Sequence, residues 1–183
     1  MKTIRSFMAL AAAITLSVAI ASASETEDFA DRFMIEELMY RYALAHDLTD
    51  PEAYAAVFAE DGELVAGGIV VAKGREALMA QAVDDRERYN PGARDGERSF
   101  MVMRHIITNP VITLNGDGTA SGICYSQIVV QEPGVGPQIL SQGRYEDEYV
   151  KQDGEWFISR REIFIADMAN YELAAEIGIG GQP

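Results

Sequence analysis

The sequence has few of the residues on which common metal and redox sites depend. It contains one cysteine, Cys124, and two histidines, His46 and His105. One cysteine excludes an internal disulfide, and this small set cannot easily provide a closed zinc site. A facial triad of His46, Asp47 and His105 is the metal alternative, and it is strained because adjacent helical residues point in different directions. We therefore expect no metal and no cofactor, and we interpret Cys124 as a small buried strand residue.

Basic residues are also scarce, with 15 Lys and Arg against 29 Asp and Glu and a net charge of -14. A protein that binds a phosphate backbone needs clustered Lys and Arg, so we expect no nucleic-acid partner. The sequence has no Gly-x-Ser-x-Gly elbow and no phosphate-binding loop. Hydrophobic residues make up 48% of the chain, which is enough to bury a core, and the length predicts one domain.

The N-terminus has the pattern of a signal peptide. Lys2 and Arg5 precede an apolar run from Phe7 to Ile20, and the small residues Ala21-Ser22-Ala23 follow. The alternative is a membrane anchor, but the run is shorter than the roughly 20 residues that a span needs. We expect a signal peptide at residues 1–23, a domain at residues 24–183, and a periplasmic or secreted protein that has no membrane contact once mature.

Three helices are predicted in the first half of the mature chain. Residues 25–47 have apolar residues at three- and four-residue spacing. Asp50-Pro51 is a typical helix start, and Asp61-Gly62 is expected to end that second helix. Residues 63–72 read as a short β segment with a Gly67-Gly68 break, and residues 74–88 as a third helix.

Strands are predicted in the second half, where the hydrophobic period changes to two. They span residues 100–108, 111–114, 119–131, 138–151 and 155–166, after a turn-rich loop at residues 89–97. A short helical piece is expected at residues 170–176. Helices followed by strands predict an α+β fold, with N-terminal helices packed on a curved antiparallel sheet and a cone-shaped pocket between them.

Four stretches carry a resemblance to a known family. They are RYALAHDLTDPEAYAAVFAEDGEL, KGREAL, MRHIITNPVITLNGDGTA and GRYEDEYVKQDGEWFISRRE, in this order. Over residues 25–165 the chain resembles SnoaL-like proteins of the NTF2-like superfamily, and in particular its scytalone dehydratase branch. It is more loosely similar to the cofactor-independent lyases that act on lignin-derived diaryl compounds. The resemblance implies an NTF2-like cone and a homodimer or homotrimer that pairs through the exposed sheet face.

The resemblance also implies a site. In the scytalone dehydratase branch a helix-borne aspartate and a strand-borne histidine face one another, and the matching residues here are Asp47 and His105. That branch has a tyrosine beside its aspartate, where this chain has His46. It has a second histidine on a later strand, in a region where this chain offers Tyr125 or Ser126.

The residues themselves support a site at these positions. Strand alternation places His105 on one face with Met103, and helical spacing places Tyr42 and His46 on one face. We expect His105 to be a general acid or base, Asp47 to orient it, and Tyr42 to polarise the substrate. His46, Met103, Tyr125 and Arg161 are expected to bind substrate. The structural alternatives are a hydrogen-bonded core histidine, an aspartate that caps the helix end, and a tyrosine that only packs.

We therefore expect a cofactor-independent lyase that acts by acid-base chemistry. It would remove water or a small fragment from a hydrophobic, aromatic, hydroxylated small molecule. One alternative is a ketosteroid-isomerase-like isomerase, and another is a periplasmic protein that binds an apolar ligand without reaction.

Overall fold

The computed structural model describes residues 2–89, 103–132 and 135–167, with the side chains of residues 25–88, 103–131 and 135–165. The predicted loop after Tyr89, the start of the first long strand, and the helical piece at residues 170–176 lie outside these ranges.

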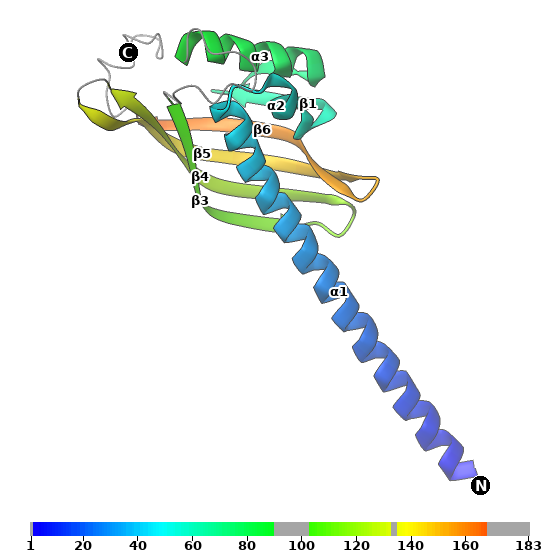
Figure 1. Cartoon of the computed structure of the whole chain (residues 1–183). Helices are drawn as coiled ribbons and strands as arrows, with labels where there is room; N and C mark the ends of the chain where they lie inside the picture. Colours follow the sequence, from blue (N-terminus) through cyan, green and yellow to red (C-terminus); the bar gives the residue numbers. More distant parts are fainter. Residues whose placement is uncertain (1, 90–102, 133–134, 168–183) are drawn as a thin grey trace.

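Three helices precede most of the sheet (Figure 1). Helix α1 spans Lys2–Asp47, α2 spans Pro51–Ala56, and α3 spans Gly74–Tyr89. The first part of α1 extends away from the rest of the molecule. Asp50 caps α2 by accepting the backbone N–H of Ala53 at 3.0 Å, as its position before a proline predicts. Among the described residues, no helix has the length and apolarity needed to cross a membrane.

Helix α2 is shorter than predicted, because the chain enters strand β1 (Phe58–Ala66) directly after it. Asp61-Gly62 therefore lies within a strand rather than at a helix end. Gly62 sits where β1 changes register against strand β6 (Glu155–Asp167), and a Cβ there would lie 2.9 Å from the carbonyl oxygen of Ile158. The glycine signals a close approach of two strands, which single-sequence analysis cannot distinguish from a helix stop.

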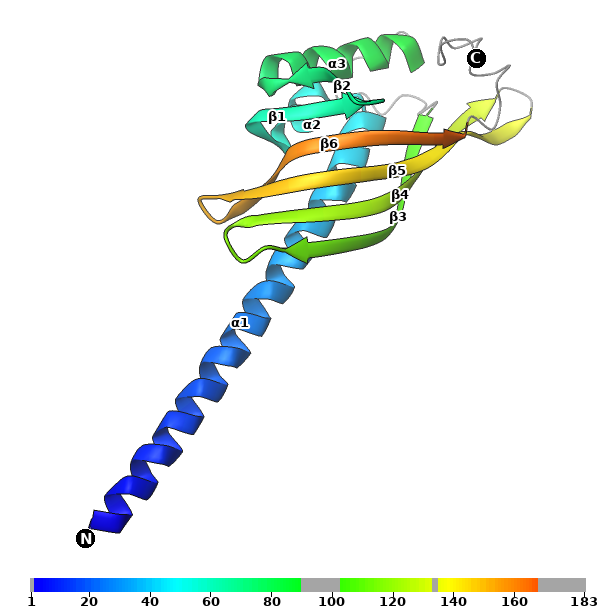
Figure 2. The same ribbon diagram turned by 180° about the vertical axis from the view of Figure 1, so that it is seen from behind.

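The sheet has six strands in the order β2-β1-β6-β5-β4-β3. The remaining strands are β2 (Ile69–Lys73), β3 (Met103–Leu114), β4 (Thr119–Glu132), β5 (Gly136–Gln152) and β6 (Glu155–Asp167). Neighbours are antiparallel except β1 and β6, which pair in parallel. The predicted α+β fold is confirmed, but the sheet is mixed rather than wholly antiparallel. Its curvature is visible in the views of Figures 1 and 2.

The core lies between the helices and one face of the sheet (Figure 2). The second half of α1 crosses this face, and α2 and α3 cover the end formed by β1 and β2. Helix α1 contributes Ile35, Leu38, Met39 and Tyr42, all buried. Phe33, predicted from its spacing to belong to this apolar stripe, is 60% exposed. The rest of the predicted stripe, from Met34 to Ala45, is buried or partly buried, and Tyr42 faces the interior as expected.

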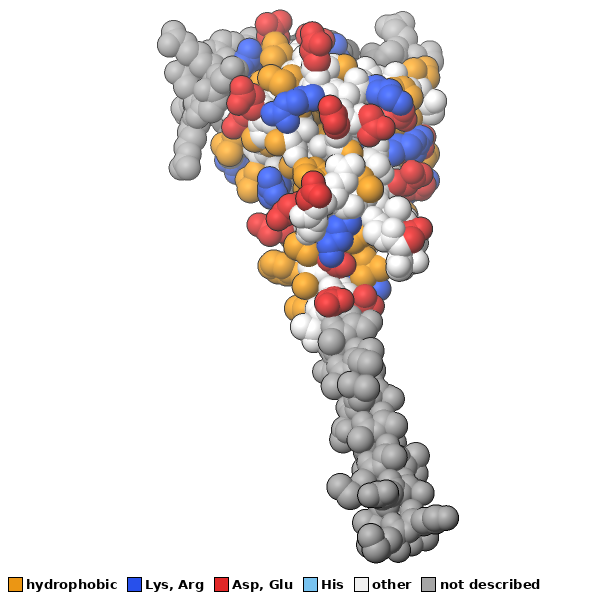
Figure 3. Space-filling view, turned by 90° about the vertical axis from the view of Figure 1, so that its right-hand side faces the viewer, with side chains coloured by type: hydrophobic (Ala, Val, Ile, Leu, Met, Phe, Trp, Pro, Cys, Tyr) orange, Lys and Arg blue, Asp and Glu red, His pale blue; other side chains and the backbone are white. Residues whose placement is uncertain are grey.

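Charged side chains of both signs share the face seen in Figure 3. Its described Lys and Arg side chains lie singly among Asp and Glu rather than in one patch. A surface that follows a nucleic-acid backbone instead has clustered basic residues.

Candidate functional site

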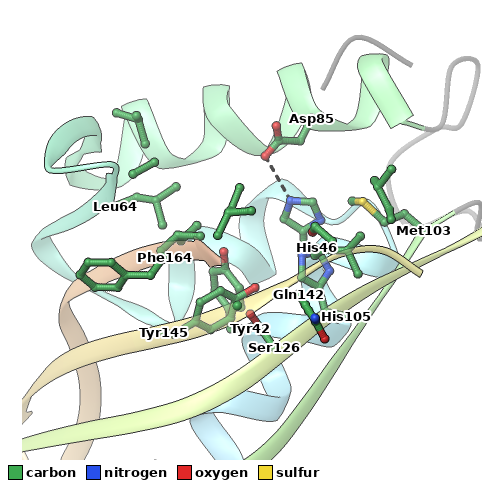
Figure 4. Close-up of a pocket in the computed structure, with 18 of the residues that line it drawn as sticks. Tyr42, His46, Leu64, Asp85, Met103, His105, Ser126, Gln142, Tyr145 and Phe164 are labelled. Atoms are coloured by element: carbon green, nitrogen blue, oxygen red, sulfur yellow. Dashed lines mark hydrogen bonds and ion pairs between the residues drawn. The ribbon is translucent and has the colours of Figure 1, made fainter. Parts of the chain in front are cut away.

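A cavity of about 250 Å³ lies between the helices and the sheet. This is slightly below the usual size of pockets for drug-sized ligands, so it suits a small molecule. Its walls are largely apolar, with Leu64, Val71, Ile128 and Leu140 among them. Its polar groups include two histidines, three tyrosines, Ser126, Gln81 and Asp85. Figure 4 shows these side chains converging from helices and strands.

His105 and Asp47 form a hydrogen-bonded pair at one side of this cavity. His105 Nδ1 lies 2.7 Å from Asp47 Oδ1, and the backbone N–H of His105 donates to both carboxylate oxygens at 3.0 Å. Strand β3 is at the edge of the sheet, so alternate N–H groups point away from β4, and that of His105 donates to the carboxylate. Asp47 is the last residue of α1, which ends as Thr49 takes a positive φ of 56°. The predicted meeting of the helix-end carboxylate and the strand imidazole is present.

The Asp47 carboxylate sets the tautomer of the His105 ring. A carboxylate can only accept, so Nδ1 carries the proton and Nε2 of the neutral ring keeps a lone pair. Burial, with a contribution from neighbouring His46, lowers the pKa of His105 below its ordinary value of 6.5, and Asp47 partly opposes this. A neutral imidazole with one free lone pair beside a cavity is suited to accept a proton.

His46 lies above His105 and is held by an acidic residue on a different helix (Figure 4). Its Nε2 is 3.1 Å from Asp85 Oδ2 of α3, and the two histidine rings meet edge to face with centroids 4.5 Å apart. Asp85 also accepts a hydrogen bond from Gln81 at 3.1 Å. His46 lines the cavity, as predicted for a substrate-binding residue.

Three tyrosines line the cavity, and two of them, Tyr42 and Tyr54, are in ring contact with the histidines. The Tyr54 hydroxyl donates to the Tyr42 hydroxyl at 3.4 Å, and the rings of Tyr42 and Tyr145 meet edge to face at 5.9 Å. Burial is the largest cause that raises the pKa of all three phenols, so they stay protonated. Since Tyr42 accepts from Tyr54, its own O–H is available to a ligand oxygen.

Arg161 points inward but does not line the cavity. Its Nε and Nη2 donate to Asp147 at 2.8 and 2.6 Å, and both side chains are fully buried. The guanidinium stacks 4.0 Å from the Tyr42 ring centroid and 4.6 Å from that of Tyr145. Arg161 was expected to contact substrate. It instead packs against the rings of two tyrosines that line the cavity, Tyr42 and Tyr145. Arg160 pairs with Glu162 at 2.8 Å, partly exposed.

Met103 and Tyr125 have different outcomes. Met103 is buried and lines the cavity beside His105. Tyr125 is 59% exposed on the other face of the sheet. Contrary to the prediction, it does not line the cavity. Strand alternation places Ser126 inward instead, and Ser126 is among the lining residues.

The side chains of His46, Asp47 and His105 are the described group that comes nearest to a metal site, with ligand atoms within 4.8 Å of one another. The Asp47 carboxylate, however, already accepts the ring and backbone N–H groups of His105. His46 is turned toward Asp85 through its Nε2. This arrangement is that of two separate His–Asp pairs rather than one facial triad.

Asp85, Gln81, Tyr54 and Tyr145 were not predicted as site residues. Asp85 had a detectable signal, because it follows the buried Leu78 and Ala82 of α3 by seven and three residues and so lies on their apolar stripe. An acidic residue on an apolar stripe requires a partner, and the partner here is His46. Tyr145 gives no comparable signal, since Tyr149 of the same strand faces the same side and is equally buried but does not line the cavity.

Comparisons with known proteins agree with this geometry. Residues 27–162 match the SnoaL-like domain family. The fold is similar to Rv3472 of Mycobacterium tuberculosis, a protein of unknown function, at 28% identity and TM-score 0.68 over 84% of this chain and 88% of that one. It is also similar to an NTF2-like protein with a cystatin-like fold from Novosphingobium aromaticivorans, at 25% identity and TM-score 0.68 over 85% and 93% of the two chains. A proposed scytalone dehydratase from N. aromaticivorans shares the fold at 24% identity and TM-score 0.64 over 80% and 91%. No curated protein matches the sequence.

Proposed function

We propose, from the premise that this chain belongs to the SnoaL-like family, that it is a cofactor-independent lyase acting by proton transfer. Its substrate would be a small, hydrophobic, aromatic molecule that carries a hydroxyl group. The observation that carries the proposal is the His105–Asp47 pair at the edge of an apolar cavity. Neighbours of known or proposed activity lie under 25% identity and contribute only the fold.

The reaction follows from the groups that face the cavity. The Tyr42 O–H donates to a carbonyl oxygen of the substrate, and His105 Nε2 takes the proton from the adjacent carbon. Asp47 holds the ring and stabilises the imidazolium that forms. The electron pair of the broken C–H bond forms a carbon–carbon double bond as the hydroxyl on the next carbon leaves. The leaving oxygen takes up one proton within the site, so the products are an unsaturated ketone and water.

The cavity walls favour this chemistry over binding alone. An apolar wall strengthens hydrogen bonds to a developing oxyanion and keeps bulk water from the base. The test is to incubate the protein with β-hydroxypropiophenone, which has one aromatic ring, and to follow phenyl vinyl ketone by chromatography and mass spectrometry. Turnover with loss of water supports the lyase. Saturable binding without product at any pH would support an apolar-ligand carrier instead.

We also propose that two or three copies associate through the outer face of the sheet. Val111, Ile123 and Tyr125 are exposed there, 62%, 38% and 59% respectively, on adjacent strands β3 and β4. Contiguous exposed apolar surface of this kind is common at subunit interfaces. Light scattering of wild type and Ile123→Arg tests this, and an equal mass for both proteins would contradict it.

Export is proposed from the N-terminal pattern, with cleavage after Ala23. N-terminal sequencing of the protein from a periplasmic extract tests it. A chain that begins at Ser24 supports export, and an intact chain in the cytoplasm would contradict it.

A further inference from the structure

One nitrogen of His46 has no hydrogen-bond partner among the described residues. The Nδ1 atom is fully buried, although the same ring is held through Nε2. The His46 side chain is 9% exposed and lines the cavity. A buried polar atom without a partner costs free energy and so marks a place where a partner is expected.

The His46 ring has a carboxylate partner and lies at a helix C-terminus. Asp85, a carboxylate, lies at Nε2, and Asp85 itself has a lowered pKa despite its burial, because His46 and Gln81 are hydrogen-bonded to it. His46 also lies in the last turn of α1, where the helix dipole stabilises cations. If the ring is charged, both nitrogens carry a proton and Nδ1 becomes a donor.

The two histidines cannot easily be charged together, because their ring centroids are only 4.5 Å apart. A charge on His46 therefore favours a neutral His105. The remaining groups that face His46 are the phenols of Tyr42 and Tyr54, with rings at 6.4 and 5.6 Å, and neither carries a charge at neutral pH. The Asp47 carboxylate, which is hydrogen-bonded to His105, also has an oxygen within 4.8 Å of a His46 ring nitrogen.

We propose that His46 is the general acid of this site, and that it donates the Nδ1 proton to the leaving hydroxyl while His105 acts as the base. Asp85 is its positioning residue. The inference rests on the proposed function and completes its proton balance. His105 gains the proton from carbon, the C–O bond breaks, and the oxygen leaves as water with the proton from His46. One proton then returns from His105 to His46, so the enzyme is unchanged after one turnover.

With this division of roles, the effect of replacing His46 depends on the leaving group of the substrate, and the effect of replacing His105 does not. Hydroxide is a poor leaving group and needs protonation, whereas chloride leaves without a proton. β-Hydroxypropiophenone and β-chloropropiophenone give the same phenyl vinyl ketone, so the pair isolates the acid's contribution. Background elimination of the chloride is subtracted by using buffer alone.

The first experiment measures both substrates with wild type, His46→Gln and His105→Gln. We expect His46→Gln to lose about a hundredfold in kcat on the alcohol and less than about fivefold on the chloride. His105→Gln should lose activity on both. Equal losses on both substrates in His46→Gln would overturn the acid role while leaving the proposed function intact.

The second experiment needs no substrate and therefore remains informative if the proposed function fails. The ring nitrogens of ¹⁵N-labelled protein are followed by NMR as the pH is lowered. The first proton taken up by the pair should appear on His46, with His105 still neutral and protonated at Nδ1. Asp85→Asn should move that proton to His105, because His46 loses the carboxylate that is hydrogen-bonded to it while His105 keeps Asp47. Asp84→Asn, an exposed neighbour on the same helix, is the matched control and should leave the order unchanged.

A neutral His46 alongside a charged His105 in the wild-type titration would overturn the inference, whatever the activity. An unchanged order in Asp85→Asn would overturn the part assigned to Asp85. Circular dichroism shows whether His46→Gln and Asp85→Asn are folded. The kinetic experiment needs only His46→Gln, and the NMR experiment needs only Asp85→Asn.

Discussion

His105 and Asp47 are joined by contacts from both the ring and the backbone of the histidine. Nδ1 lies 2.7 Å from Asp47 Oδ1, and the backbone N–H lies 3.0 Å from each carboxylate oxygen. The carboxylate thus fixes the end of α1 to the edge strand of the sheet and sets the histidine tautomer at the same time. The same carboxylate therefore stabilises the fold and orients His105. A test of Asp47 must measure stability and catalysis separately.

Asp47→Asn should lower kcat for dehydration by about a hundredfold or more. An amide can still accept the backbone N–H, but it no longer stabilises the imidazolium, and its NH₂ group can select the wrong tautomer. The measurement is kcat on β-hydroxypropiophenone together with the urea midpoint. Asp28→Asn, an exposed residue of the same helix, is the control. Full activity in a folded Asp47→Asn protein would contradict the orienting role.

Tyr42→Phe should lower kcat by about a hundredfold with little change in stability. The substitution removes one O–H that we assign to the substrate carbonyl and keeps the ring on which Arg161 stacks. The comparison is Tyr145→Phe, which removes a hydroxyl from the same cavity. If Tyr42→Phe only raises KM and leaves kcat unchanged, its hydroxyl binds the ground state and does not stabilise the transition state.

The rate should fall on the acid side only below the ordinary histidine value of 6.5. Burial and the neighbouring His46 lower the pKa of His105, so the ring stays neutral and able to accept a proton below that pH. The measurement is the pH dependence of kcat/KM for β-chloropropiophenone, which reports the free enzyme. An inflection above 6.5 would contradict a base in this environment.

The same shift predicts a loss of stability with acidification. The unfolded chain takes up the His105 proton near 6.5, and the folded chain takes it up only at a lower pH. Between these two values the unfolded state binds more protons, so the free energy of unfolding decreases as the pH falls. His105→Gln should flatten this part of the stability profile.

Asp147→Asn should destabilise the fold by about 3–5 kcal/mol, because it leaves the Arg161 charge buried without its counter-ion. Both side chains are fully buried, and Asp147 also accepts the Tyr149 hydroxyl at 2.6 Å. Urea unfolding followed by tryptophan fluorescence gives the free energy. A double variant, Asp147→Leu with Arg161→Met, should recover most of the loss, whereas a loss below about 1 kcal/mol in Asp147→Asn would contradict a dominant role for the pair.

Much of the fold and part of the site could be predicted from the sequence. Alternation in β3 placed Met103 and His105 on the inner face, and Asp50-Pro51 marked the start of α2, because these signals are local. The resemblance supplied the pairing of Asp47 with His105. The parallel pairing of β1 with β6 depends on strands far apart in the chain, so no local pattern reveals it.

The residues that were misplaced or missed have separate physical causes. Arg161 was expected to bind substrate, but a buried guanidinium requires a counter-ion, and Asp147 on the adjacent strand supplies it. Tyr125 was expected in the cavity because it lies in the region where the scytalone dehydratase branch has a second histidine, although its alternation with Cys124 and Ser126 places it outside. Asp85 was missed because its partner lies 39 residues away, on a different helix.

His105→Gln is the variant that tests the account most directly. The measurement is kcat on β-hydroxypropiophenone for the folded variant, with product identified by mass. The account predicts a decrease of about a hundredfold or more, because the group that accepts the carbon-bound proton is removed. Turnover close to that of the wild-type protein would contradict it, since proton transfer would then not depend on the imidazole held by Asp47.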